Sequence, residues 1–230
     1  MDGFVKVLRF NPMIDEKPYY QEYKYEYEKG MTVLDVLNYI YEKTDSTLSY
    51  SYNCRNGHCG ICALMVNGKP VLACKKIALP QMKIEPLRNF QVLKDLIIDR
   101  EEYEKRILKL RLFLERQYGK NGSTIKIQPE KIDMNNFEQF KVASRCVKCS
   151  ACLSVCPIYS KNQHLFLGPM GYILEARHLF DSRDDLNREI ILKTEGIELC
   201  TDCGLCSEVC VHKVNPAQII KDIKKIIKSK

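Results

Sequence analysis

Twelve cysteines are the residues of this sequence best suited to chemistry, and all of them fall into three groups of four. The opening residues lack the basic and apolar stretches of a secretory signal, so we expect the chain to stay in the reducing cytoplasm. Thiols clustered in a reducing compartment bind metals more often than they pair as disulfides. We therefore interpret each group as the ligand set of a metal centre.

The first group has the spacing of a plant-type 2Fe–2S site. Its pattern is C-x4-C-x2-C-x11-C, and its members are Cys54, Cys59, Cys62 and Cys74. The C-x4-C-x2-C core is typical of a tight loop around a 2Fe–2S cluster. Gly57 and Gly60 lie inside this loop, where glycine permits the positive φ angles that turn backbone N–H groups toward sulfur. A structural zinc site is the weaker alternative, because zinc ligands usually come as two separated knuckles.

The second and third groups share the spacing C-x2-C-x2-C-x3-C. In bacterial ferredoxins this run binds cubane clusters, and the fourth cysteine of each run reaches the other cluster. Pro157 follows the second run as is usual, whereas Val211 follows the third. The first predicted 4Fe–4S cluster has the ligands Cys146, Cys149, Cys152 and Cys210. The second predicted 4Fe–4S cluster has the ligands Cys156, Cys200, Cys203 and Cys206.

No other residues form a catalytic constellation. His58 and His212 lie close to cluster cysteines in the sequence, but each predicted cluster already has four thiols. We therefore interpret both histidines as residues that lie beside a cluster's ligands or at the surface, and not as ligands themselves. The chain has no Gly-rich dinucleotide fingerprint, no Walker loop and no H-E-x-x-H motif. We expect no catalytic residues, and hence an electron carrier that needs a partner for substrate chemistry.

The charge balance argues against a nucleic-acid partner. The formal net charge is +7, but three oxidised clusters with four thiolates each would add about −2 apiece and leave about +1. We interpret the lysine-rich residues 221–230 as a solvated helix end, with contact to a membrane surface or a partner as the weaker alternative. No apolar run approaches the roughly 18 residues of a transmembrane helix.

Residues 1–100 predict a β-rich domain with one helix. Thr32 is the expected cap of that helix, in which Val33, Val36, Leu37 and Ile40 recur at helical spacing. The tyrosine-rich strand is interpreted as sheet surface rather than a platform for bases. The expected strands cover residues 5–10, 19–27, 63–66, 71–73 and 83–86.

From Glu101 the periodicity becomes helical. Tyr103, Ile107, Leu110 and Leu114 mark one face of an amphipathic helix, and a surface loop is expected over residues 119–123. Beyond residue 135 the pattern indicates short helices between cysteine motifs. The sequence therefore predicts an α+β chain with a domain boundary near residue 100, giving domains 1–100 and 101–230.

Both halves contain motifs in the order of one known family. CRNGHCGIC (Cys54–Cys62) and LACKK (Leu72–Lys76) match its 2Fe–2S loop. RFNP (Arg9–Pro12) and DSTLSY (Asp45–Tyr50) match its opening, and ARHLFDSRDD (Ala176–Asp185) matches the segment between its later cysteine motifs. On these motifs the chain resembles the iron–sulfur subunit of succinate dehydrogenases and fumarate reductases over nearly its whole length.

The resemblance implies an architecture and a role. It implies a plant-type 2Fe–2S ferredoxin domain of the β-grasp type, followed by an all-α domain like a bacterial ferredoxin with two cubane clusters. It also implies a separate flavoprotein subunit that carries FAD and converts succinate or fumarate. This chain would relay single electrons between that subunit and a further electron carrier or membrane-anchor subunit. The expected location is the cytoplasm, with a peripheral position on the inner face of the cytoplasmic membrane left open.

Two departures from the family pattern leave alternatives open. Most members have an apolar residue at the position of Cys203 and hold a 3Fe–4S cluster there, so the fourth cysteine predicts a 4Fe–4S cluster with 3Fe–4S as the alternative. The tryptophan and histidine of the usual quinone pocket are absent, with Ser160 and Thr201 in those neighbourhoods, so we expect no quinone reduction at a pocket of this chain. A thiol- or disulfide-linked flavoprotein complex and a zinc-stabilised binding module are the alternative functions.

Overall fold

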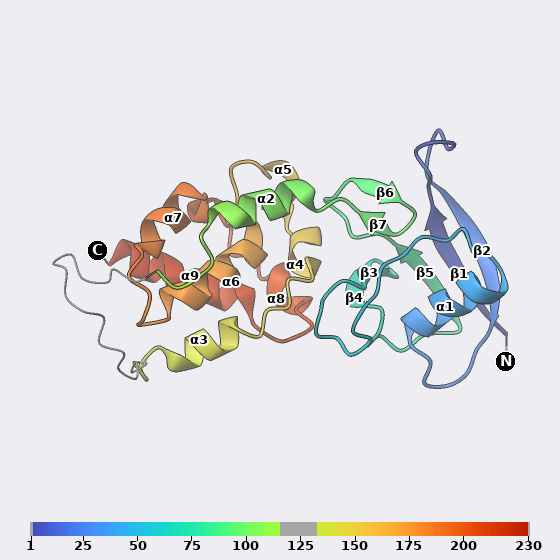
Figure 1. The fold of residues 1–230 in the computed structure, drawn as a ribbon, viewed down its shortest axis with the longest axis horizontal. Coiled ribbons are helices and arrows are strands. Elements are labelled where there is room, and N and C mark those ends of the chain that lie inside the picture. The colour runs from blue at the N-terminus through green and yellow to red at the C-terminus, as the bar shows by residue number, and fades with distance from the viewer. Residues whose placement is uncertain (1, 116–132, 230) are drawn as a thin grey trace, which may run out of the picture. The chain divides into compact units, whose positions relative to one another are not determined.

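The computed structural model describes residues 2–115 and 133–229, so the loop predicted over residues 119–123 lies outside the described residues (Figure 1). The chain divides into two compact units. The sheet unit comprises Met1–Glu101 and Val147–Val155, and the helical unit comprises Glu102–Cys146 and Cys156–Lys230. The two units differ from the predicted domains, which had one boundary near residue 100, in a single segment. Residues 147–155 pack with the sheet unit.

A five-stranded mixed sheet forms the centre of the sheet unit. β1 runs antiparallel to β2 and parallel to β5, while β3 runs antiparallel to both β4 and β5. The turn from β3 to β4 contains Asn67 and Gly68, both with positive φ, as the Asn-Gly pair predicts. In spatial order the strands are β2 (Tyr19–Glu26), β1 (Asp2–Arg9), β5 (Gln81–Glu85), β3 (Ala63–Val66) and β4 (Lys69–Leu72).

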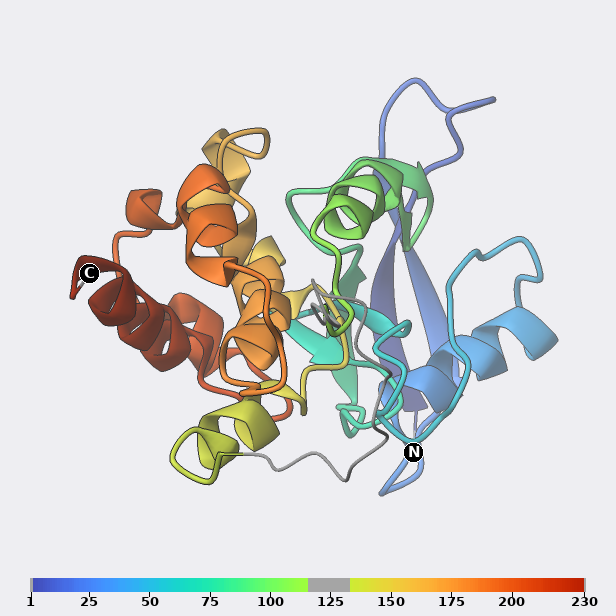
Figure 2. The ribbon, with the colours of Figure 1, turned by 60° about the vertical axis from the view of Figure 1, so that its left-hand side comes forward.

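Helix α1 (Val33–Lys43) packs against this sheet, and both views show it beside the strands (Figures 1 and 2). The helix begins where expected, because the Thr32 side chain accepts the Asp35 N–H and the Asp35 side chain accepts the Thr32 N–H. Its apolar face shares one core with alternate residues of β1. Full burial of each such aliphatic side chain contributes about 1.5–3 kcal/mol. This core includes residues of β3 and β4, the strands next to Cys62 and Cys74 of the first cysteine group.

The interpretation of β2 as a surface strand was wrong for two of its tyrosines. Tyr23 and Tyr25 are buried, whereas Tyr19 and Tyr20 are 46 % and 44 % exposed. Tyr25 fits because it lies over Gly3 of β1, where a methyl group would come within 2.5 Å of the ring, and its hydroxyl donates to the Leu79 carbonyl at 2.6 Å. An alternation of tyrosine with charged residues therefore marks one buried face here.

A second, two-stranded sheet was not predicted. β6 (Val92–Lys94) and β7 (Ile97–Ile98) form an antiparallel hairpin whose tip holds Asp95 in the left-handed region, at φ 48°. The Asp95 N–H donates to the Phe10 carbonyl at 2.8 Å, and the Leu96 N–H donates to the Ser49 carbonyl at 3.1 Å. The hairpin thus links the end of β1 to the chain that leads into the first cysteine loop.

The helical unit surrounds helix α6 (Gly168–Leu179), which is buried along most of its length (Figure 2). It packs against α3 (Phe137–Ala143), α7 (Arg188–Thr194) and α9 (Pro216–Lys228). The short helices expected beyond residue 135 are present. Among the described residues no helix is long and apolar enough to cross a membrane. The other helices of this unit are α2 (Glu101–Lys109), α3 (Phe137–Ala143), α5 (Pro157–Lys161), α7 (Arg188–Thr194), the 3-10 turn η1 (Ile197–Leu199), α8 (Leu205–Glu208) and α9 (Pro216–Lys228).

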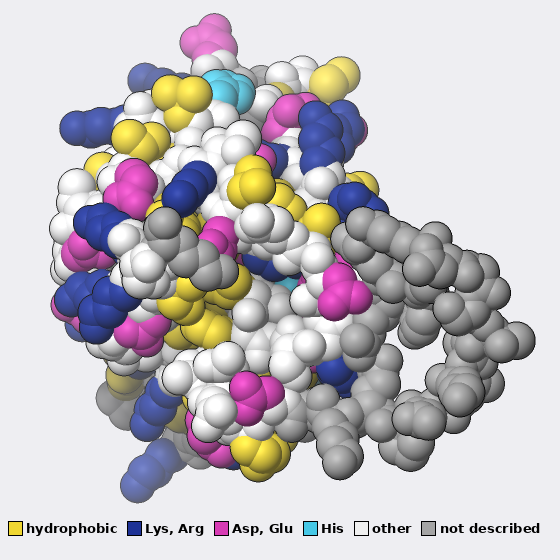
Figure 3. All heavy atoms as spheres, turned by 90° about the vertical axis from the view of Figure 1, so that its left-hand side faces the viewer, with side chains coloured by type: hydrophobic (Ala, Val, Ile, Leu, Met, Phe, Trp, Pro, Cys, Tyr) yellow, Lys and Arg dark blue, Asp and Glu magenta, His cyan; other side chains and the backbone are white. Residues whose placement is uncertain are grey.

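Two predictions for helices need correction. The predicted face of α2 continued to Leu114, but the helix ends at Lys109, before Arg111 adopts a left-handed φ of 53°. The C-terminal helix α9 is more than a solvated end, because four of its five isoleucines are buried, and Ile220 and Ile223 are fully buried. On the face of the helical unit in Figure 3, Lys and Arg side chains alternate with Asp and Glu, so this face is of mixed charge.

A buried charged cluster lies at the start of α7. The Arg188 guanidinium donates to the carbonyls of Leu110 and Phe113, each at 3.0 Å, and to Asp184 at 2.7 Å. It also pairs with the fully buried Glu175 on α6 at 3.5 Å. Neither carboxylate oxygen of Glu175 has a hydrogen-bond partner among the described residues. The Arg188 side chain therefore links residues 110–113, which follow α2, to the core of the helical unit.

Candidate metal centres

The loop at Cys54 is shaped to hold a thiolate. Three backbone N–H groups donate to the Cys54 sulfur, from Asn56 at 3.4 Å and from His58 and Cys59 at 3.3 Å each. The Asn56 and Cys59 N–H groups are the largest cause of a pKa for this thiol that is lowered to about 6. A cysteine must be deprotonated to ligate iron. The donor arrangement therefore fits an iron–sulfur cluster.

Left-handed residues make this arrangement possible. Arg55, Gly57 and Gly60 have φ angles of 55°, 76° and 73°. Successive turns of this kind point backbone N–H groups inward at a negative centre. The prediction that the loop glycines adopt positive φ is confirmed by these angles.

Cys62 and Cys74 are held by the β3–β4 hairpin. Cys62 directly precedes β3, Cys74 follows β4, and the Ala73 N–H donates to the Cys62 carbonyl at 3.0 Å. Both thiols are buried, and their sulfur atoms lie 3.4 Å apart. Burial raises the pKa of Cys62 to about 12, because it disfavours the charged thiolate. A bound cation would reverse this preference, since metal binding displaces the proton.

The segment 147–155 carries two cysteines of the second group into the sheet unit. It includes the short helix α4 (Ala151–Ser154), and Cys149 packs on the hydrophobic core of that unit. The Asn89 side-chain amide donates to the Leu153 carbonyl at 2.8 Å. Cys149 and Cys152 therefore belong to the sheet unit, whereas Cys146 and Cys210 belong to the helical unit. Ligation of one cluster by these four remains a prediction.

The second predicted 4Fe–4S site takes its four cysteines from two different motifs, and all four belong to the helical unit. Cys156 is the N-cap of α5, and its sulfur accepts the Tyr159 N–H at 3.5 Å. Burial raises the pKa of Cys206 to about 12, and charge on the thiols of the other three cysteines adds to the rise. Cys203 is the exposed member. These four are the residues predicted to share a cluster: Cys156, Cys200, Cys203 and Cys206.

Other side chains support the cysteine loops of the helical unit. Lys224 on α9 donates to the Cys200 carbonyl at 2.6 Å and pairs with Asp202 at 3.2 Å. The Cys210 sulfur accepts the Val214 N–H at 3.3 Å. Across residues 2–115 and 133–229, no three His, Cys, Asp or Glu side chains meet as ligands of one ion would.

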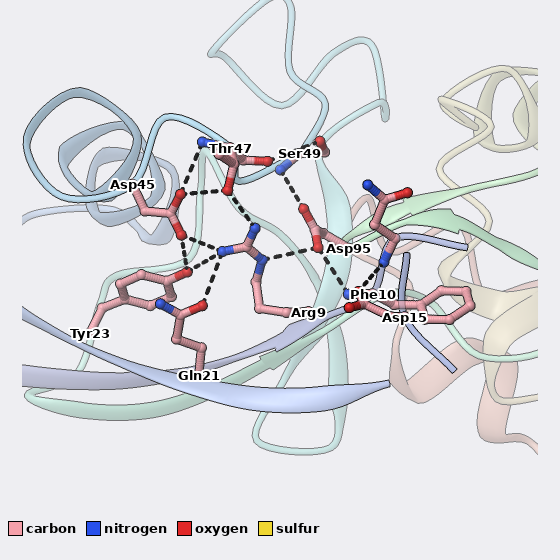
Figure 4. Close-up of polar contacts among 10 residues, drawn as sticks. Arg9, Phe10, Asp15, Gln21, Tyr23, Asp45, Thr47, Ser49 and Asp95 are labelled. Carbon is pink, nitrogen blue, oxygen red and sulfur yellow. Dashed lines mark hydrogen bonds and ion pairs between the residues drawn. The ribbon is translucent and has the colours of Figure 1, made fainter. Parts of the chain in front are cut away.

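Sequence reasoning missed a buried polar network around Arg9 in the sheet unit (Figure 4). Arg9 is 6 % exposed, and its guanidinium donates to Asp95 at 3.0 Å and to Thr47 at 2.8 Å. It also contacts Asp45 and Tyr23. Arg9 and Asp45 lie in two of the motifs that carry the family resemblance, but no local pattern signals that they meet.

The network fixes the segment that leads into the cysteine loop. Besides Arg9, Asp95 accepts the Ser49 N–H at 2.9 Å and the Phe10 N–H at 2.9 Å. Burial of Asp45 opposes its ionisation, but hydrogen bonds from Thr47, Tyr23 and Arg9 prevail and hold its pKa below the ordinary value. Both carboxylates pair with the buried guanidinium.

Comparisons with known proteins agree with this geometry. Residues 4–105 match the family "2Fe-2S iron-sulfur cluster binding domain", and residues 142–214 match "4Fe-4S dicluster domain". The chain is 33 % identical to the fumarate reductase iron-sulfur subunit of Haemophilus influenzae, over 96 % of this chain and 91 % of that protein. It is 34 % identical to the Mycobacterium tuberculosis subunit of the same name, over 97 % and 92 %.

Two further relatives extend the comparison. One subunit of the fumarate reductase (CoM/CoB) of Methanothermobacter marburgensis is 34 % identical over 96 % of this chain, which spans only 43 % of that protein. In fold, the chain is similar to the solved Mycobacterium smegmatis Sdh1 complex in the apo form. The TM-score is 0.82 at 21 % identity, and the match covers 99 % of this chain and 96 % of that one.

The fold and the cysteine sites define an α+β iron–sulfur protein with a 2Fe–2S domain and a 4Fe–4S domain, as predicted. The chain belongs to the iron–sulfur subunits of the fumarate reductase and succinate dehydrogenase family. It is therefore an electron-transfer subunit of an oxidoreductase complex and not the subunit that converts the substrate. The predictions of fold class, family and general function are confirmed.

Proposed function

We propose that this chain relays single electrons between an FAD-bearing flavoprotein subunit and a second carrier or membrane-anchor subunit. The complex would be a fumarate reductase or succinate dehydrogenase, located in the cytoplasm or peripherally on the inner face of the cytoplasmic membrane. The observation that carries the proposal is the loop around Cys54, in which three backbone N–H groups donate to one cysteine sulfur. Such donors favour the deprotonated thiol that ligates iron in a cluster.

The proposed cofactors are one 2Fe–2S cluster and two 4Fe–4S clusters. When bound, these clusters supply one-electron redox chemistry. The chain would hold them through three ligand sets: Cys54, Cys59, Cys62 and Cys74 for 2Fe–2S; Cys146, Cys149, Cys152 and Cys210 for the first 4Fe–4S; Cys156, Cys200, Cys203 and Cys206 for the second.

The chain's own groups would set how readily each site accepts negative charge. The N–H groups directed at the Cys54 sulfur stabilise added charge, and burial of Cys62 and Cys74 keeps water from the other side of the same site. In the helical unit, the ammonium of Lys224 next to Cys200 acts in the same direction. These are positioning and electrostatic roles rather than catalytic ones.

A second candidate function is the electron-transfer subunit of a thiol- or disulfide-linked flavoprotein complex. Two observations favour it: the fourth cysteine, Cys203, and the 34 % identity to a protein of the CoM/CoB fumarate reductase. Ser160 and Thr201, in place of the usual quinone-pocket residues, support a carrier other than a quinone bound by this chain. Identification of the chains that co-purify with the protein separates the two functions.

Metal analysis of the complex purified without oxygen tests the cofactor set. We expect about ten irons per chain with matching acid-labile sulfide and no stoichiometric zinc. Two or three zincs with little iron would instead support a zinc-stabilised binding module and contradict the proposal.

The variant Cys203→Ala tests the second 4Fe–4S cluster. A cubane keeps its fourth iron through a fourth ligand, so the variant should convert this one cluster to a 3Fe–4S form. Electron paramagnetic resonance of the oxidised complex should show the new signal, with the other two clusters unchanged. Glu208→Gln, at an exposed residue of α8, is the control and should show no such signal. A strong 3Fe–4S signal in the native complex, unchanged by Cys203→Ala, would refute the assignment.

A further inference from the structure

We infer that Gly60 is a positioning residue, which sets how closely the 2Fe–2S cluster and the first 4Fe–4S cluster approach each other. The inference rests on the proposed function, because it takes Cys59 and Cys62 as ligands of one cluster and Cys149 as a ligand of the other. Gly60 lies between the first two and contacts the third. All four residues belong to the sheet unit.

The contact at Gly60 leaves no room for a side chain. A methyl group on Gly60 would lie 2.5 Å from the Val147 carbonyl oxygen and 2.9 Å from the Cys149 Cα. Both distances are well inside van der Waals contact, and both atoms belong to the backbone; the next nearest atom, the Cys149 Cβ at 3.0 Å, is bonded directly to that Cα. The two cysteine motifs therefore touch directly through their main chains at this point.

The opposing segment cannot easily move away. Ala151, Leu153 and Ser154 are almost fully buried, and the Asn89 amide holds the Leu153 carbonyl at 2.8 Å. The Ser154 hydroxyl also lies 3.9 Å from the Met65 sulfur on β3. Because closely packed interiors transmit strain, a side chain at Gly60 must push the cysteine loop and the 147–155 segment apart.

The separation matters because electron tunnelling depends on orbital overlap, which decays steeply with distance. The magnetic interaction between two reduced clusters also falls, with the inverse cube of their separation. A small displacement at Gly60 should thus change both quantities while every cysteine ligand remains. A change in both quantities with every ligand in place would therefore result from the distance between the clusters and not from the loss of a ligand.

The same loop provides a matched control. Gly57 has nearly the same backbone conformation as Gly60, with φ 76° against 73°. The nearest atoms to a methyl group on Gly57 are side-chain carbons of Lys75, the closest at 2.9 Å, and a lysine side chain can move aside. Alanine at either glycine must adopt a left-handed backbone conformation that L-residues disfavour, so this cost is common to both variants. Only alanine at Gly60 also meets fixed backbone.

The experiment compares Gly60→Ala and Gly57→Ala in the intact complex. Iron content and the separate spectrum of each cluster are measured first. The spin–spin interaction is then measured with both clusters reduced, and the rate of electron transfer is measured from one cluster, reduced, to the other, oxidised. We expect Gly60→Ala to keep both clusters but to weaken the interaction and slow the transfer several-fold, with Gly57→Ala like the native complex. Native-like interaction and rate in Gly60→Ala would overturn the inference, as would the absence of any interaction in the native complex.

Two further outcomes are distinguished. If the native complex lacks the 2Fe–2S or 4Fe–4S spectrum, the proposed function fails rather than the role of Gly60. If Gly60→Ala does not assemble both clusters, Asn89→Ala decides, because it releases the Leu153 carbonyl and leaves both cysteine motifs unchanged. A weaker interaction in Asn89→Ala supports the inference, and an unchanged one refutes it.

Discussion

Replacement of Arg9 by methionine should destabilise the sheet unit by about 3–5 kcal/mol, the range for breaking a buried ion pair. The reason is the charge that it leaves behind. The side chains of Asp95 and Asp45 are only 2 % and 16 % exposed, and both pair with the Arg9 guanidinium. Methionine fills much of the space of the arginine stem, so the loss reflects the missing charge more than a cavity.

The magnitude follows from the partners that each carboxylate keeps. A hydrogen bond to a charged group contributes about 1.5–3 kcal/mol, and Arg9 makes one with each aspartate. Asp45 keeps bonds from Thr47 and Tyr23, so its share of the loss is the smaller one. Asp95 keeps only backbone N–H donors, at Phe10 and Ser49, among the described residues.

Differential scanning calorimetry and hydrogen exchange measure the effect. The unfolding temperature of the sheet unit should fall by about 6–20 °C, from a change of 2–4 °C per kcal/mol in chains of this size. Amides of β1 and of residues 45–49 should lose most protection, because the network joins these two segments. Exchange in the helical unit should remain as in the native protein.

Two variants test the reasoning about charge. Arg9→Met combined with Asp95→Asn removes one stranded charge and should be more stable than Arg9→Met alone. Lys24→Met breaks the exposed Lys24–Asp2 pair, whose side chains are 62 % and 58 % exposed, and should change stability far less than Arg9→Met, because water screens the pair. Equal effects of Arg9→Met and Lys24→Met would refute the reasoning, because burial would then have no influence on the loss.

Two further predictions concern the helices. Thr32→Ala removes both hydrogen bonds that the Thr32 side chain makes with Asp35 at the start of α1. The variant should lower the free energy of unfolding by about 0.5–2 kcal/mol, and Thr44→Ala at the other end of α1 should lower it less. Equal losses in the two variants would contradict the capping role of Thr32. Burial raises the pKa of Glu175 to about 7 from an ordinary 4.5, so between these pH values the folded chain binds one proton more than the unfolded chain. The protonated Glu175 therefore contributes stability that is fully present below pH 4.5 and is lost as the pH rises through 7. The glutamine of the variant Glu175→Gln cannot ionise, so the stability of the variant relative to the native protein should rise by up to about 3 kcal/mol between pH 4.5 and 7. Parallel curves of stability against pH for the two proteins would show that Glu175 is not the titrating group.

Local signals in the sequence predicted the local parts of the structure. Ligand geometry dictates cysteine spacing, so the three groups could be recognised without any knowledge of the fold. The cap at Thr32 depends on residues close in sequence and was predicted. The turn at Asn67 is equally local, since the Asn-Gly pair by itself favours it. The end of α2 was not, because the left-handed conformation of Arg111 has no strong sequence signal in an arginine.

The contacts that could not be predicted join residues far apart in the chain. Arg9 meets Asp95, 86 positions away, and nothing in either neighbourhood indicates the pairing. Tyr23 and Tyr25 alternate with charged residues in a pattern that suits either face of a sheet, and only packing on Gly3 and the core selects the buried one. The packing of residues 147–155 with the sheet unit likewise depends on tertiary contacts.

These long-range contacts explain how the ligand loops keep their unfavourable backbone. Left-handed conformations at Arg55, Lys148 and Asp202 flank cysteines in all three groups and cost roughly 1–2 kcal/mol each in residues other than glycine. Such conformations persist only where the surrounding structure enforces them. Arg9 fixes the chain before the first loop, Asn89 binds the second cysteine run at Leu153, and Lys224 binds the third at Cys200. A sequence with the same cysteine spacing but without these contacts would need to order its loops as each cluster binds, and its affinity for iron and sulfide would fall by that cost.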